Sequence, residues 1–218
     1  MNRKFDLLVF DWDGTLADST GVIVRAMQMM CRDLDMPAPS DDTANYVIGM
    51  ELSHALRYVL PELTEESLPF AIERYRTNYL ALENDIRLFD GIGELIRRLH
   101  KASFSLAVAT GKNRRGLERV FSSLDMRRFF LSSRCGDECF SKPHPQMLEE
   151  LIDEIGAEKE RTLMIGDTTH DLQMAINAEV AGVAVCYGAH PAEELRRLKP
   201  LACLSHVGEL DEWLSANA

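Results

Sequence analysis

Short apolar runs alternate with amphipathic segments along most of the chain. The run at 5–10 ends in acidic residues and a Gly-Thr turn, which is typical of a buried strand entering a loop. Strands alternating with helices predict βαβ units and a parallel sheet buried on both faces, although spacing does not give the strand order. The further predicted strands are 104–109, 129–133, 161–165, 181–186 and a short one at 201–204. The predicted helices are 91–102, 113–124, 144–156, 170–179, 191–198 and 206–216.

The segment 19–85 breaks this alternation. Its apolar positions follow a helical period, and prolines separate the predicted helices 20–35, 52–60 and 65–83. A block of helices directly after the first strand predicts a separate helical module inserted into an α/β core. We therefore predict a core of residues 1–18 plus 86–218 and a helical domain of residues 19–85.

Composition excludes several classes of protein. The 218 residues are 46% apolar and 27% charged, which is ordinary for a globular chain and unlike a disordered or collagen-like one. The 24 basic and 35 acidic residues give a net charge of −11, so we expect no nucleic-acid partner and no membrane partner. The apolar stretch before Asp11 is too short for a signal peptide, and five scattered cysteines do not suggest a disulfide framework. These features predict a cytoplasmic protein.

Acidic residues follow two of the predicted strands. Asp11 and Asp13 follow the first strand, and Asp167 and Asp171 follow 161–165. Ligands of open α/β sheets bind at the carboxyl ends of the strands, where these side chains would meet. A divalent cation would relieve the repulsion between such carboxylates. Each pair by itself also fits a polar loop or the acid-rich start of a helix.

Two further clusters fall in loops at or after strand ends. Thr110 and Gly111 follow 104–109, where a hydroxyl and a backbone N–H can bind phosphate oxygens. Lys142 precedes a proline and a predicted helix. Taken alone, these features fit a turn and a solvent-facing lysine. Together with the acids they supply a nucleophile, a hydroxyl, a cation and metal ligands, which are the requirements of phosphoryl transfer.

These motifs, in this order, resemble those of the haloacid dehalogenase superfamily: Asp11-Trp12-Asp13-Gly14-Thr15, Thr110, Lys142 and Gly166-Asp167-Thr168-Thr169-His170-Asp171. The resemblance covers nearly the whole chain. It implies an α/β fold with a Rossmann-like, doubly wound parallel sheet, and a helical cap of the C1 type over 19–85. Within the superfamily the chain is most similar to the phosphoglycolate phosphatase-like branch.

The resemblance implies a role for each acidic residue. Asp11 would attack the phosphate and form an aspartyl-phosphate. Asp13 would protonate the leaving oxygen and then activate water. Mg²⁺ would bind the Asp11 carboxylate, the Asp13 backbone carbonyl and the Asp167 carboxylate, and Asp171 would act through water or support the other ligands.

The resemblance also implies the phosphate contacts. Thr110 and the Gly111 amide would hold phosphate oxygens, although many relatives have Asn where this chain has Gly111. Lys142 would neutralise the nucleophile and the phosphate. Gly49, in the turn 48–50, would bring the cap backbone close to the substrate, or it is a plain interhelical turn.

Residue identities separate the branches of the superfamily. Dehalogenases and phosphonatases lack the second acid that Asp13 supplies, and 19–85 contains no lysine for the Schiff base of a phosphonatase. Thr15 favours a phosphatase over mutases of the β-phosphoglucomutase type, which usually have Val there.

Other residues have plainer interpretations. We expect Trp12 to point into the core and Met27 to belong to the core of the cap. His170 could touch the leaving group, but we expect it to face solvent at the start of its helix. Four arginines could meet a substrate carboxylate, but most are expected to be solvated: Arg57, Arg74, Arg76 and Arg87.

The sequence thus predicts a Mg²⁺-dependent phosphomonoesterase that acts on a small phosphorylated metabolite such as phosphoglycolate. The partner is a small-molecule phosphate ester, and the chain is expected to be a monomer or a homodimer. The alternatives are a phosphosugar mutase, a sugar-phosphate or nucleotide phosphatase, and a binding protein that has kept the fold without the chemistry.

Overall fold

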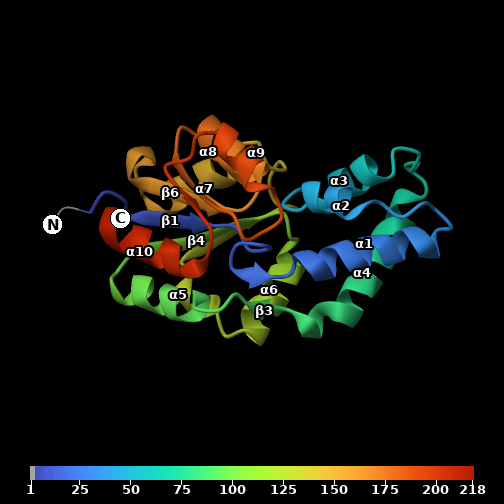
Figure 1. Cartoon of the computed structure of the whole chain (residues 1–218), viewed down its shortest axis with the longest axis horizontal. Helices are drawn as coiled ribbons and strands as arrows, with labels where there is room; N and C mark the ends of the chain where they lie inside the picture. Colours follow the sequence, from blue (N-terminus) through green and yellow to red (C-terminus); the bar gives the residue numbers. More distant parts are fainter. Residues whose placement is uncertain (1–2) are drawn as a thin grey trace.

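A six-stranded parallel sheet forms the centre of the computed structural model, which describes residues 3–218 (Figure 1). The strand order is β5-β4-β1-β6-β7-β8, so the first strand of the chain lies inside the sheet with β4 and β6 as its neighbours. The strands are β1 (Leu7–Phe10), β4 (Ser105–Thr110), β5 (Ser132–Cys135), β6 (Thr162–Gly166), β7 (Ala181–Val185) and β8 (Cys203–Leu204). The predicted α/β class is confirmed.

Helices cover both faces of the sheet because alternate residues of each strand point to opposite sides. Leu7 and Val9 of β1 pack on the side of α7 and α8, whereas Leu8 and Phe10 pack on the side of α5, α6 and α10. The short α9 packs against α8 and β7. These helices are α5 (Ile92–Lys101), α6 (Arg114–Ser123), α7 (Gln146–Ile155), α8 (Thr169–Asn177), α9 (Ala192–Arg197) and α10 (Val207–Asn217), with 3₁₀ turns at Arg127–Phe129 and Lys159–Arg161.

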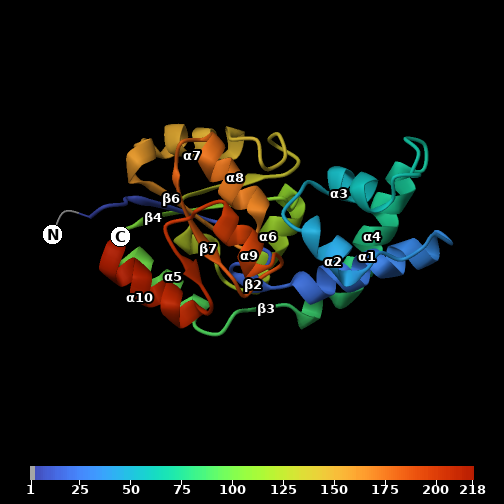
Figure 2. The same cartoon turned by 45° about the horizontal axis from the view of Figure 1, so that its top comes forward.

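Four helices extend from the carboxyl end of the sheet, and we refer to residues 19–85 as the cap (Figures 1 and 2). The long helices α1 and α4 pack along each other. The chain leaves and re-enters the core through the antiparallel pair β2 (Ala17–Asp18) and β3 (Arg87–Leu88). The cap elements are α1 (Thr20–Asp33), α2 (Asp41–Tyr46), α3 (Leu52–Val59), α4 (Leu68–Leu82) and a 3₁₀ turn at Glu83–Asp85.

The predicted strand 129–133 is wrong in its position. Its first residue ends a 3₁₀ turn, and β5 occupies Ser132–Cys135 instead. Phe130 stacks on Phe121 with ring centroids 5.5 Å apart, so this apolar side chain anchors the chain before the strand begins. Because β5 is an edge strand, it tolerates polar residues, and an apolar run therefore does not mark its position.

Two predicted helix ends are confirmed. The Asn113 side chain caps α6 by accepting a hydrogen bond of 2.7 Å from the Gly116 N–H. Gly156 ends α7 in the left-handed conformation with φ of 73°. The six-residue α2, capped by Ser40, was not predicted because it is too short to show a helical period.

Trp12 is fully buried, as predicted, and its ring meets Phe121 edge-on at 5.3 Å. Its indole N–H has no hydrogen-bond partner among residues 3–218.

We expect Trp12→Ala to lower the free energy of unfolding by about 3–5 kcal/mol, because it leaves a cavity beside the sheet. Trp12→Phe should cost only about 1–2 kcal/mol, since it keeps an aromatic contact and removes an unpaired donor. Urea denaturation measures both values, and equal losses would contradict this account of the packing.

Candidate functional site

Three aspartates meet at the carboxyl edge of the sheet. Asp11 follows β1 and Asp167 follows β6, two adjacent strands, and Asp171 lies in the first turn of α8. Each offers a carboxylate oxygen, and these oxygens lie within 4.8 Å of one another. Lys142 Nζ lies 2.7 Å from Asp11 Oδ1 and 2.6 Å from Asp171 Oδ1. Four residues singled out in the sequence therefore form one buried cluster.

The hydrogen bonds of this cluster show which carboxylates could take a metal ion. Both oxygens of Asp171 are used, by Lys142 on one side and by the amide and hydroxyl of Thr168 on the other. Asp11 Oδ2, in contrast, is buried and has no hydrogen-bond partner in the described part of the chain. A buried carboxylate oxygen without a donor is costly, and a divalent cation would satisfy it. The residues present therefore fit Mg²⁺, with Asp11 as a direct ligand. Asp171 would instead hold Lys142 and Thr168 in position.

The electrostatics of the cluster point the same way. Burial raises the pKa of Asp11 well above its usual value; Lys142 opposes this effect, and the Asp171 and Asp167 carboxylates add to it. Burial, and next the Asp171 carboxylate, raises the pKa of Asp167 to about 7. Burial alone would lower the pKa of Lys142, but Asp11 and Asp171 raise it above its usual value. One cation thus faces three crowded acids, so further positive charge is needed before all three can be ionised together.

The backbone around Asp167 leaves no space for other side chains. Thr15 donates a hydrogen bond of 2.6 Å to Asp167 Oδ1, and the Ala189 N–H donates one of 2.7 Å to Oδ2. A Cβ atom on Gly14, where φ is +84°, or on Gly188 would collide with this carboxylate. The glycine after Asp13 is therefore required both by its own conformation and by the closeness of Asp167.

Asp13 has a different environment from Asp11. Its Oδ1 accepts a hydrogen bond of 2.7 Å from the Ser19 hydroxyl, and Lys112 Nζ lies 2.9 Å from its Oδ2. Lys112 also donates to the Tyr79 hydroxyl of α4 at 3.0 Å, so one ammonium joins Asp13 to the cap. Burial alone would lower the pKa of Lys112, but Asp13 and Tyr79 raise it above its usual value. No role was predicted for Lys112, although its position two residues after Thr110 was a usable signal.

The loop between α2 and α3 lies directly on the core. Thr110 ends β4 and is buried, and Gly111 follows it. A Cβ atom on Gly111 would lie 2.5 Å from the Gly49 carbonyl oxygen and would also collide with that of Met50. The Glu51 N–H donates a hydrogen bond of 3.0 Å to the hydroxyl of Ser141, beside Lys142. The turn at Gly49 thus packs against Gly111, at the end of β4, and against the loop that carries Lys142.

The expectation for His170 is wrong. The residue is only 7% exposed, and its Nε2 donates to the backbone carbonyl of Tyr46 at 2.8 Å. His190 Nε2 donates to the same oxygen at 3.0 Å, while its Nδ1 accepts from the Thr169 N–H. Burial lowers the pKa of both histidines. His170 was expected in solvent because the sequence does not show that the end of α2 covers it.

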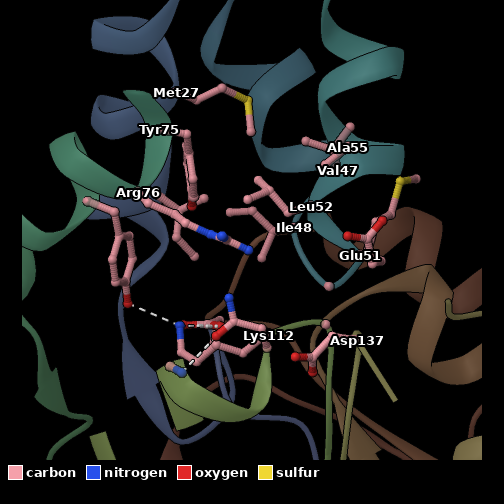
Figure 3. Close-up of a pocket in the computed structure, with 18 of the residues that line it drawn as sticks. Met27, Val47, Ile48, Glu51, Leu52, Ala55, Tyr75, Arg76, Lys112 and Asp137 are labelled. Carbon is pink, nitrogen blue, oxygen red and sulfur yellow. Dashed lines mark hydrogen bonds and ion pairs between the residues drawn. The ribbon is translucent and has the colours of Figure 1, made fainter. Parts of the chain in front are cut away.

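The structure gives the four arginines considered for a substrate carboxylate different surroundings. Arg57 pairs with Glu65, Arg74 pairs with Asp33, and Arg87 donates to backbone carbonyls of its own turn. Arg76 instead points into a cavity between the cap and the core (Figure 3). Met27 is buried in the cap as predicted, and it also lines this cavity.

The chain belongs to the haloacid dehalogenase-like hydrolase family, whose model matches residues 8–185. Among curated proteins it is similar to a probable phosphatase, IndB, of Dickeya dadantii, with 30% identity over 94% of this chain and 91% of that protein. It is also similar to a phosphoglycolate phosphatase of Agrobacterium fabrum, with 29% identity over 84% of this chain and 81% of that protein. The resemblance inferred from the motifs is confirmed.

Solved structures support the fold. A hydrolase from Pseudomonas syringae superimposes with a TM-score of 0.89 at 24% identity, covering 98% of this chain and 99% of that one. Within residues 3–218, no helix combines the length and the apolar character needed to cross a membrane.

Proposed function

We propose that the protein is a Mg²⁺-dependent phosphomonoesterase that hydrolyses a small phosphorylated metabolite through an aspartyl-phosphate. The observation that carries the proposal is the buried cluster of Asp11, Asp167, Asp171 and Lys142, in which one oxygen of Asp11 has no donor. The names of the relatives, two of them phosphatases, agree with this chemistry.

In the first half-reaction, a carboxylate oxygen of Asp11 attacks phosphorus, and the bond from phosphorus to the ester oxygen breaks. Asp13 donates a proton to the departing oxygen, so the alcohol leaves neutral. The Ser19 hydroxyl and the Lys112 ammonium hold the Asp13 carboxyl group in place. Thr110 and the Gly111 amide follow the neighbouring strand β4 at the same edge of the sheet, and in this proposal they bind phosphate oxygens.

In the second half-reaction, Asp13 removes a proton from a water molecule, whose oxygen attacks phosphorus and releases Asp11 and inorganic phosphate. Lys142 stays charged and stabilises negative charge on Asp11 and on the phosphate. Mg²⁺, held by the carboxylates of Asp11 and Asp167 and the backbone carbonyl of Asp13, would supply further positive charge to the phosphate oxygens. Asp171 keeps Lys142 in position.

We further propose that residues 19–85 act as a cap that closes over the substrate, with Gly111 permitting the closed contact. Gly111→Ala places a methyl group against the carbonyls of Gly49 and Met50, so the cap loop must move away. We expect KM for 4-nitrophenyl phosphate to rise about tenfold, which corresponds to a clash of roughly 1–3 kcal/mol.

Gly21→Ala in α1 is the matched control for that variant, because a Cβ atom there meets nothing within 4 Å. It should leave KM unchanged. Equal KM values for Gly111→Ala and Gly21→Ala would show that the loop contact has no part in substrate binding.

The direct test of the function is phosphate release. With Mg²⁺ and 4-nitrophenyl phosphate, the protein should release inorganic phosphate and 4-nitrophenol in equal amounts. A phosphosugar mutase would return the phosphoryl group to a sugar phosphate, and a binding protein would release none from any ester. A cytoplasmic location and a monomeric or homodimeric state remain predictions.

A further inference from the structure

A cavity of about 420 Å³ opens between the cap and the core on the Asp13 side of the site (Figure 3). Asp13, Gly111 and Lys112 line its floor, whereas Asp11 and Asp167 are not among its lining residues. Because Asp13 faces the departing oxygen in the proposed reaction, the cavity lies where the alcohol part of the ester must go. The side chains that line the cavity therefore determine which ester is accepted.

The cap side of this cavity is mostly apolar. A volume of this size falls in the range of roughly 300–1,000 Å³ that holds ligands much larger than a two-carbon acid. Glycolate, the alcohol part of phosphoglycolate, would leave most of the apolar surface uncovered. The apolar lining comes from α1, the loop after α2, α3 and α4: Ile23, Met27, Val47, Ile48, Leu52, Ala55 and Leu80.

The cap contributes one cation to the lining of this cavity. Arg76 of α4 extends its guanidinium into the cavity above Lys112 (Figure 3). Within residues 3–218 it has no carboxylate partner, unlike Arg57 and Arg74, which form ion pairs outside the cavity. Lys112 adds little free charge to the floor, since Asp13 pairs with it. On the core side, Arg119 of α6 pairs with Glu83, whereas Arg115 lines the cavity without a carboxylate partner among residues 3–218. Among the lining residues, Arg76 is thus the cation that the cap offers to a substrate.

The acidic residues near the cavity are already occupied. The Glu51 carboxylate caps α3 by accepting from the Ser53 and His54 amides, and Asp137 accepts from the Arg114 N–H. They weaken the positive potential on their side of the cavity but do not reach Arg76 as partners. An anionic group of the substrate would therefore be drawn to the α4 side.

We infer that the substrate is a phosphate monoester whose alcohol part has an apolar body, aromatic or branched aliphatic, and a carboxylate at its far end. The apolar body packs against the cap wall, and the carboxylate pairs with Arg76. Hydrolysis transfers a proton from Asp13 to the ester oxygen and yields the free hydroxy acid and inorganic phosphate. This inference rests on the proposed phosphatase function and names its substrate class.

The test compares three alkyl esters whose leaving groups are chemically alike: phosphoglycolate, benzyl phosphate and 4-carboxybenzyl phosphate. With Mg²⁺ and release of inorganic phosphate as the common readout, we expect kcat/KM for benzyl phosphate to exceed that for phosphoglycolate at least about tenfold. The carboxylate of 4-carboxybenzyl phosphate should add about another tenfold, the value of one partly desolvated charged hydrogen bond.

Two variants and one control separate the parts of the inference. Arg76→Gln should remove the preference for 4-carboxybenzyl over benzyl phosphate, and Arg74→Gln, two residues earlier on the same helix, should keep it. Leu52→Asn should lower kcat/KM for both benzyl esters about tenfold relative to phosphoglycolate, because it places an amide in the apolar wall.

Three results would overturn the inference while phosphatase activity is present. They are phosphoglycolate hydrolysed as efficiently as the benzyl esters, equal kcat/KM for the two benzyl esters, and a carboxylate preference that survives Arg76→Gln. Failure to hydrolyse any ester, 4-nitrophenyl phosphate included, would instead overturn the proposed function, and the inference with it.

Discussion

Asp11→Asn will abolish phosphate release and lower kcat by about 10⁴-fold or more, the loss expected when a nucleophile is removed. An amide of the same shape can still accept the hydrogen bond from Lys142, so the cluster keeps its geometry. It cannot, however, form the bond to phosphorus. Thermal stability should be unchanged or higher, because burial disfavours the charged carboxylate at this position, as its raised pKa shows.

The measurement is the rate of phosphate release from 4-nitrophenyl phosphate with Mg²⁺, together with the melting temperature of each variant. Asp18→Asn is the control, because Asp18 is exposed on β2 and this substitution removes the same charge outside the cluster. It should retain full activity. An Asp11→Asn variant with more than about a tenth of the original rate would exclude nucleophilic catalysis by Asp11.

Removing the metal ion should have the second largest effect. After dialysis against EDTA, we expect activity to fall at least about a hundredfold and to return on addition of Mg²⁺, since the ion contributes several kcal/mol to the transition state. Three carboxylates whose oxygens lie within 4.8 Å would otherwise face an anionic substrate with only Lys142 to balance them.

A thermal readout tests the same site without catalysis. Mg²⁺ at about one hundred times its Kd should stabilise the folded protein by about 2.7 kcal/mol and raise the melting temperature accordingly. Asp167→Asn should reduce this shift. Asp153→Asn, on α7 and exposed, should show the full shift. Full activity after treatment with EDTA would show that the reaction needs no metal ion. A full thermal shift in Asp167→Asn would show that Mg²⁺ binds elsewhere.

The chemistry-bearing residues could be predicted because each follows a strand or lies near the start of a helix in the α/β core. Asp11, Lys142, Asp167 and Asp171 were named from that pattern, and the structure brings them together. An apolar run followed by acids and glycine is a local signal, and it survives in a single sequence.

What could not be predicted depends on contacts between distant segments. The bond between Lys112 and Tyr79 joins the core to α4 of the cap, and neither residue carries a local sign of it. His170 was expected in solvent because Tyr46, the residue that buries it, belongs to the cap and lies far away in the sequence. The Arg76 side chain could be distinguished from Arg57 and Arg74 only when their carboxylate partners were visible.

The pairing of β2 with β3 has a consequence for how such a protein can change. Ala17 lies opposite Leu88 and Asp18 opposite Arg87, so the two ends of the cap are hydrogen-bonded neighbours. To the core, the whole helical segment is equivalent to a hairpin loop, whose length and content can vary without altering the path of the sheet. The apolar wall and the carboxylates to which we assign selection and cleavage of the ester can therefore evolve as separate modules.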